Sequence, residues 1–142
     1  SGHVDGLILA AAGLMRLGLT DTIIEHLDPK QFIPSAGQGT LAIECRSDDD
    51  LTAQYLNPLN DSITQAALTA ERACMRTLGG HCHAPIAAYA YGDTTLTLAA
   101  WVGNGPALYA EQTQTLETAE SLGLAVAETL NQQGAQTRLL KP

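Results

Sequence analysis

The chain has 142 residues, 45% of them hydrophobic, which is enough to bury the core of one domain or of one domain plus a piece of another. Fifteen acidic residues against seven basic ones give a formal charge of −8, and no basic run exceeds one residue, so we expect no nucleic-acid partner. Three cysteines without regular spacing favour a reducing compartment, and we expect a cytoplasmic protein.

The first predicted elements are short. Residues 4–11 are predicted to form a buried strand, and residues 12–17 a short helix that ends at Gly18. A second short helix is expected over residues 20–27. The apolar stretch at residues 7–17 is too short for a membrane span and lacks the basic leader of a signal peptide. The chain starts without methionine and enters a strand-like run at once, so we expect a fragment whose N-terminal part is missing.

The next segment is irregular. Glycines within residues 34–39 predict a loop, which leads into a strand at residues 40–46. The acidic run at residues 48–50 is typical of a solvated turn. The sequence Asn-Pro-Leu-Asn at residues 57–60 marks the clearest boundary in the chain.

Two longer helices are predicted after this boundary. The first covers residues 62–78, begins with a capping box formed by Ser62 and Gln65, and ends at the glycine pair 79–80. The second covers residues 117–133. Its buried positions are Ala119, Leu122, Val126 and Leu130.

Three strands are predicted between these helices, at residues 84–91, 94–102 and 107–115. Turns at residues 92–93 and 103–106 join them as hairpins. The order helix, three antiparallel strands, helix predicts a small α+β unit.

The cysteines differ in their surroundings. Cys45 lies in a strand-like run and Cys74 on the apolar face of a helix, so both are expected to be buried packing residues. Cys82 lies in a glycine-loosened loop between a helix and a strand, where a thiol is available to react. Cys82 is therefore the main candidate functional residue.

Several chemistries are open to the sequence His81-Cys82-His83. Zinc is disfavoured because three adjacent residues do not readily face one tetrahedral centre and no further ligand motif is present. A cysteine hydrolase activated by a neighbouring histidine is an alternative. Against it, Cys82 follows a helix C-terminus, whose partial negative charge disfavours a thiolate. The position suits a thiol that reacts once and stays modified.

Separated signatures carry a family resemblance. They are Asp5 to Leu14 with Arg16 to Leu19, Pro34 to Gly39, Ile43 to Arg46, Asn60-Asp61, Ala70 to Ala73, and the Cys82 loop that ends at Pro85-Ile86. In this order and spacing the chain resembles the C-terminal part of the hydroxymethylbilane synthase family, also called porphobilinogen deaminase. The family deaminates four porphobilinogen molecules and joins them head to tail into hydroxymethylbilane, in haem biosynthesis.

The resemblance implies that Cys82 holds a dipyrromethane cofactor as a thioether. The acetate and propionate groups of the growing chain need donors, and three positions match the family here: Arg16, Gln38 and the backbone of Ala10. Arg46, Arg72 and Arg76 are expected to be structural, with Arg72 pairing with Glu71 or Asp61. The family more often has glycine in place of His81, which puts the conformation of this loop in doubt.

The resemblance also implies a division of the chain. Residues 1–33 would complete a middle domain, and residues 34–58 would cross back to an N-terminal domain, both being periplasmic-binding-protein-like α/β domains. Residues 59–142 would form the α+β cofactor-attachment domain. The catalytic aspartate would lie upstream, so we expect the fragment alone to be inactive. We also expect no metal, no membrane association and a monomeric full-length enzyme. A non-catalytic ligand-binding module and a cysteine hydrolase remain the alternatives.

Overall fold

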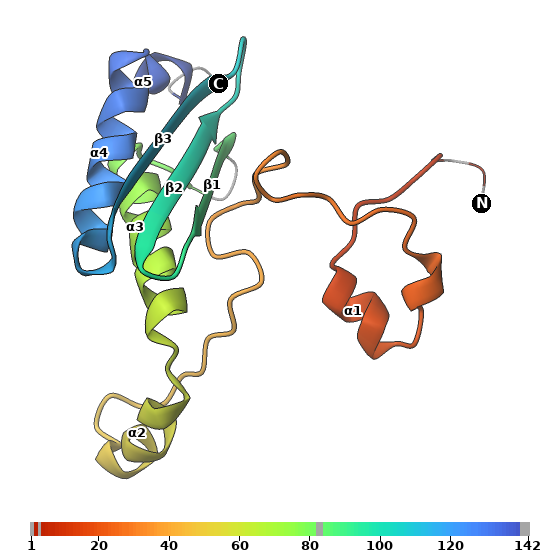
Figure 1. The fold of residues 1–142 in the computed structure, drawn as a ribbon, viewed down its shortest axis with the longest axis vertical. Coiled ribbons are helices and arrows are strands. Elements are labelled where there is room, and N and C mark those ends of the chain that lie inside the picture. The colour runs from red at the N-terminus through yellow and green to blue at the C-terminus, as the bar shows by residue number, and fades with distance from the viewer. Residues whose placement is uncertain (1, 3, 82–83, 140–142) are drawn as a thin grey trace.

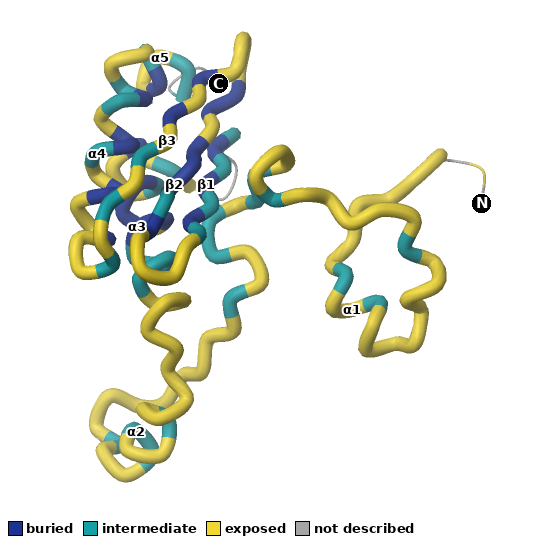
Figure 2. The backbone as a smooth tube through the Cα atoms, viewed as in Figure 1, coloured by how far each residue is buried: buried dark blue, intermediate teal, exposed yellow. Residues whose placement is uncertain are grey.

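The computed structural model describes residues 2, 4–81 and 84–139. Its C-terminal half is an α+β unit in which two long helices, α3 and α4, cover one face of a three-stranded sheet (Figure 1). The N-terminal part is drawn out beside this unit, and Figure 2 shows that the buried residues are concentrated in the unit. No helix in the described part of the chain is long and apolar enough to cross a membrane.

Helix α3 spans Ser62–Thr77 and confirms the first long helix predicted from the sequence. Its N-cap is Asp61, whose carboxylate accepts a hydrogen bond from the Thr64 amide at 2.7 Å. The predicted capping box was therefore wrong by one residue, because Ser62 is already helical. A carboxylate at this position also interacts favourably with the positive end of the helix dipole.

The sheet consists of β1 (Ile86–Tyr91), β2 (Thr95–Val102) and β3 (Leu108–Thr115), antiparallel and in sequence order, which confirms the three predicted strands. Its inner face carries small residues at the centre. Ala88 pairs with Ala100, which pairs with Ala110, and all three are buried. These short side chains let the helices approach the sheet closely.

Helix α4 spans Ala119–Gln132 and follows the 3-10 turn η3 (Leu116–Thr118). The four positions predicted to be buried in this helix are all buried. Gly123 faces α3 so closely that a Cβ atom there would lie 2.6 Å from the Cβ of Ala73. A further helix, α5 (Ala135–Leu139), was not predicted.

The outer face of the sheet is aromatic. Tyr89 and Tyr91 stack with their ring centres 5.6 Å apart, and the Lys30 ammonium lies 4.2 Å from the Tyr91 ring centre. Trp101 and Tyr109 form a cross-strand pair on the same face. The Lys30 contact is a cation–π interaction that holds the preceding segment beside β1.

The first part of the chain contains only short elements. These are α1 (Ala11–Arg16), η1 (Thr20–Thr22), α2 (Asp50–Leu56) and η2 (Asn57–Leu59). The predicted helix at 12–17 is confirmed, but the strands expected at residues 4–11 and 40–46 are absent, and the helix expected at 20–27 is reduced to η1. A strand needs a hydrogen-bonded neighbouring strand, and among the described residues only β1, β2 and β3 form a sheet.

The acidic run at residues 48–50 has a structural use that the sequence did not indicate. Asp49 is the N-cap of α2 and accepts hydrogen bonds from the backbone amide and the hydroxyl of Thr52, at 3.0 and 2.8 Å. These bonds lower the pKa of the Asp49 carboxyl. Part of the run therefore starts a helix rather than a turn.

We predict that Gly123→Ala destabilises the α+β unit by about 1–3 kcal/mol, because the added methyl group has no space against α3. Helix propensity alone would make this substitution stabilising, because alanine favours a helix more than glycine does, so the expected destabilisation has the opposite sign. Urea unfolding would measure the change. Ser121→Ala, on the exposed side of the same helix, is the matched control and should change stability by no more than about 0.5 kcal/mol.

Candidate functional site

The chain reaches Cys82 through a well-defined helix end. Gly79 has a left-handed φ of 74° and donates to the Arg76 carbonyl at 3.0 Å, while Gly80 donates to the Met75 carbonyl at 2.8 Å. This pair of bonds is the Schellman motif. A side chain at Gly80 would meet the Met75 carbonyl at 2.9 Å, so both glycines are required. The predicted end of the helix at residues 79–80 is confirmed.

The chain is equally well held where it returns from the loop. The Ala84 amide donates to the His81 carbonyl at 2.9 Å, and the Gly103 amide donates to the Pro85 carbonyl at 2.8 Å. The two hydrogen-bonded segments on either side of the loop, residues 79–81 and 84–85, are called its arms below. Cys82 and His83 lie between them in the sequence but outside the described residues. Within the described part of the chain, Asn104 is the only non-glycine residue with a positive φ. His81 therefore does not have the left-handed backbone conformation, which a residue with a Cβ atom tolerates poorly.

The loop that carries Gln38 consists of two successive turns. The Gln38 amide donates to the Ser35 carbonyl and the Thr40 amide to the Gly37 carbonyl, each at 3.1 Å. Gly37 and Gly39 have φ values of 75° and 81°, which confirms the predicted loop and explains its glycines. The Gln38 side chain is exposed, and its Oε1 accepts from the Ser35 hydroxyl at 3.1 Å. This bond leaves the Gln38 Nε2 group as the outward donor.

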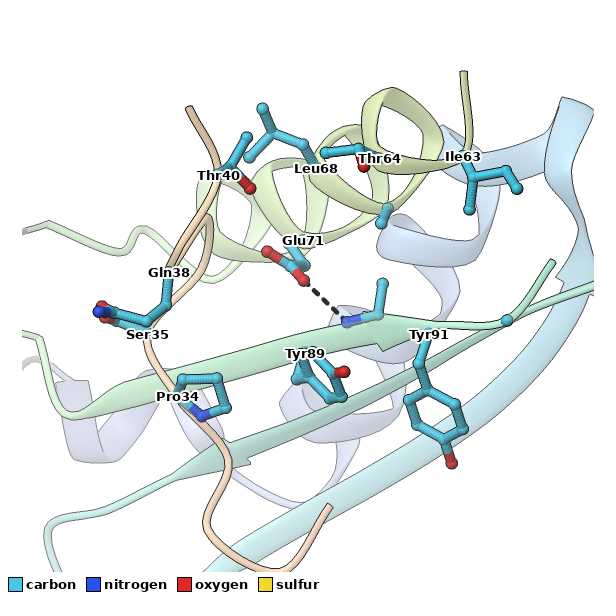
Figure 3. Close-up of a pocket in the computed structure, with 13 residues that line it drawn as sticks. Pro34, Ser35, Gln38, Thr40, Ile63, Thr64, Leu68, Glu71, Tyr89 and Tyr91 are labelled. Carbon is cyan, nitrogen blue, oxygen red and sulfur yellow. Dashed lines mark hydrogen bonds between the residues drawn. The ribbon is translucent and has the colours of Figure 1, made fainter. Parts of the chain in front are cut away.

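This loop lies along the free edge of β1. The Pro34 carbonyl accepts from the Ala88 amide at 3.0 Å, and the Glu71 carboxylate on α3 accepts from the amides of Gly37 and Ala90, at 2.6 and 2.8 Å. A pocket of about 300 Å³ lies between the loop, α3 and β1, and Figure 3 shows Glu71 within it. Sequence reasoning missed the role of Glu71.

Glu71 is buried, with 6% of its surface exposed. Burial holds the pKa of its carboxyl above the ordinary value, because desolvation outweighs the two amide hydrogen bonds that favour the ionised form. The expected pairing of Arg72 with Glu71 or Asp61 is absent among the described residues. Glu71 instead serves the two amides, and Asp61 caps α3.

The other predicted ligands lie on or next to α1. Ala10 is the N-cap of α1, and its carbonyl accepts from the Gly13 and Leu14 amides at 3.1 and 3.4 Å. Arg16 is exposed in the last turn of α1. Figure 1 shows α1 apart from the α+β unit. The structure thus places Gln38 beside β1 and does not bring Arg16 to it.

The two described cysteines differ from each other. Cys74 is buried as predicted, and burial raises the pKa of its thiol to about 12. Cys45 was expected to be buried in a strand, but it is exposed because that strand does not form. No group of three His, Cys, Asp or Glu side chains that could hold a metal occurs among the described residues.

The remaining arginines that were expected to be structural form exposed ion pairs. Arg46 pairs with Asp48 at 3.3 Å, and Arg76 pairs with Glu120 at 3.6 Å, which joins α3 to α4. Exposed pairs of this kind stabilise a protein by about 0–1 kcal/mol. They support the fold weakly and offer no cation to the loop at residues 34–40.

The described elements form a segment of short helices and loops joined to a small α+β unit. Two family models match the chain in this order: "Porphobilinogen deaminase, dipyromethane cofactor binding domain" over residues 1–54, and "Porphobilinogen deaminase, C-terminal domain" over residues 65–132. The chain belongs to the porphobilinogen deaminase family.

Curated relatives agree with these matches. The chain is 43% identical over 136 residues to a porphobilinogen deaminase of Syntrophotalea carbinolica, a match that covers 93% of the chain and 43% of the relative. It is 41% identical over 143 residues to that of Coxiella burnetii, covering 98% and 47%, and 42% identical over 140 residues to that of Bacillus cereus, covering 96% and 45%. The chain thus spans less than half the length of these relatives.

We predict that a thiol reagent at neutral pH labels Cys45 in the native chain and leaves Cys74 unlabelled. The Cys74 thiol is buried and its raised pKa keeps it protonated, whereas Cys45 is exposed. Peptide mass spectrometry after brief labelling would locate the adducts. Labelling in denaturant is the control, and native labelling of Cys74 at the rate of Cys45 would contradict the described core.

We also predict a pH dependence of stability from Glu71. Its carboxyl binds a proton more tightly in the folded chain than in the unfolded one, so the unfolding free energy falls as the pH rises above about 4.5, through the raised pKa. Glu71→Gln removes this slope. Urea unfolding of both proteins over this range measures the difference, and parallel curves would show that the Glu71 pKa is not raised.

Proposed function

We propose that this chain is the cofactor-carrying portion of a porphobilinogen deaminase, a transferase that joins four porphobilinogen molecules into hydroxymethylbilane for haem synthesis. The observation that carries the proposal is the ordered match to the cofactor-binding and C-terminal domains of that enzyme. The relatives with this activity in their names are about twice as long, so the activity belongs to the whole protein. A cytoplasmic location stays a prediction from the cysteine pattern.

Cys82 is the proposed covalent anchor of dipyrromethane, as a thioether. When bound, this group supplies the primer to which porphobilinogen units are joined. The described arms support an anchor: the Schellman motif at Gly79-Gly80 holds one side of the loop, and the His81–Ala84 hydrogen bond closes its base. A thiol on such a base can be attached once and kept in place.

Gln38 is the proposed donor to a carboxylate of the cofactor. Its Nε2 group is exposed and oriented by the bond from Ser35, and an outward amide donor suits the acetate and propionate groups of a pyrrole chain. Arg16 is the proposed charged partner, because a guanidinium binds a carboxylate with two parallel hydrogen bonds. The backbone of Ala10 is a third proposed contact, at the base of α1.

We further propose that residues 1–33 and 34–58 belong to two other domains, and that residues 59–142 form the attachment domain. Support comes from the exposed apolar side chains of the first part, such as Leu7, Ile8 and Leu41. The proposed cover is the N-terminal part of the same protein, which would bring the acid–base aspartate and further arginines. The 142-residue chain alone is then inactive, and the complete protein is a monomer.

The test is the intact mass of this chain when it is produced together with the N-terminal part of a porphobilinogen deaminase, in cells that make porphobilinogen. We expect an added mass of two pyrrole units, which Cys82→Ser abolishes. Cys45→Ser, which removes an exposed thiol elsewhere, is the matched control and should keep the added mass. An unmodified wild-type chain, or a modification that depends on Cys45 instead, would contradict the anchor. Acyl labelling of Cys82 that requires His81 or His83 would favour a hydrolase.

A further inference from the structure

Glu71 has no part in the proposed chemistry, yet it is the one buried charged residue in the described part of the chain. Its two oxygens accept from different segments. Oε2 accepts from the Gly37 amide and Oε1 from the Ala90 amide, the bond drawn in Figure 3. Hydrogen bonds to a carboxylate are about twice as strong as neutral ones. A single side chain on α3 thus ties a distant loop to the edge of β1.

The loop has little freedom at the residue that Glu71 binds. Gly37 has a left-handed φ of 75°, and a Cβ atom there would lie 3.1 Å from Leu68 Cδ1 on α3. Together with the bond between Pro34 and Ala88, the carboxylate fixes both ends of a four-residue stretch. Gln38 follows immediately, and its amide is oriented by Ser35 from within that stretch.

We propose that Glu71 is a positioning residue, which holds the loop so that the Gln38 amide points outward as a donor. The proposal rests on the proposed function, in which Gln38 binds a cofactor carboxylate. Glu71 itself touches neither cofactor nor substrate. It acts through the Gly37 amide, one residue away from Gln38.

The carboxylate cannot be replaced by an amide of the same shape. In Glu71→Gln one oxygen becomes an NH₂ group, which faces a backbone N–H, so one hydrogen bond is lost and two donors meet. Glu71→Asp keeps both oxygens but has a shorter side chain, which cannot span both amides. Glu71→Gln therefore tests the loss of the charged acceptor at constant side-chain length. Glu71→Asp tests the loss of length with the charge kept.

The first readout is hydrogen exchange of individual amides in the 142-residue chain. In Glu71→Gln we expect the Gly37 or the Ala90 amide, whichever loses its acceptor, to exchange about tenfold faster, as loss of one net hydrogen bond implies. The Ala100 amide in the central strand reports whether the fold is intact. Glu128→Gln, an exposed glutamate on α4, is the matched control and should change neither amide. If Glu71→Gln fails to fold, Glu71→Asp is measured in its place.

The second readout distinguishes positioning from support of the strand edge. Nitrogen relaxation of the Gln38 side-chain amide should show an ordered group in the wild type and a mobile one in the Glu71 variants. If only the Ala90 amide responds while the Gln38 side chain stays equally ordered, the positioning role is overturned. Both readouts are independent of cofactor. A chain that never gains mass on Cys82 would therefore contradict the proposed function and leave the positioning role of Glu71 unaffected.

Discussion

One buried carboxylate connects the two parts of this chain that the family models treat separately. Glu71 lies within the segment that matches the C-terminal domain, and Gly37 lies within the segment that matches the cofactor-binding domain. Because an amide of the edge strand depends on the same side chain, the carboxylate also replaces the neighbour that β1 lacks on this side. The desolvation that raises its pKa is the cost of placing an acid where it can reach both segments.

The α+β unit is held together in a different way, by small residues at the closest contacts between its layers. The alanine row across the sheet and Gly123 on α4 bring the backbones together, so that leucine and valine side chains fill the remaining space. In the first part of the chain Ala36 packs against this core, whereas large apolar side chains such as Leu7, Ile8 and Leu41 stay exposed. The buried core of the described residues thus lies in the α+β unit, and most of the exposed large apolar side chains lie in the first part of the chain.

The elements that sequence alone predicted correctly are those that local pattern determines. The spacing of Leu122, Val126 and Leu130 and the glycine pair after α3 were sufficient for the two helices, and the hairpin turns were sufficient for the sheet. The expected strand at residues 40–46 failed because its formation depends on a neighbour, and Cys45 was placed wrongly with it. Glu71 was missed because its partners lie 34 and 19 residues away, a separation that no periodicity reveals.

The position of Trp101 gives the chain an optical property of its own. It is the only tryptophan, and its ring lies so close to Gly103 that a Cβ there would meet it at 2.7 Å, while the Gly103 amide is bonded to Pro85 on the returning arm of the Cys82 loop. Any group that shifts this arm alters the surroundings of the indole. The emission of a single native fluorophore therefore follows events at the cysteine loop, without a label and without disturbing a residue of the site.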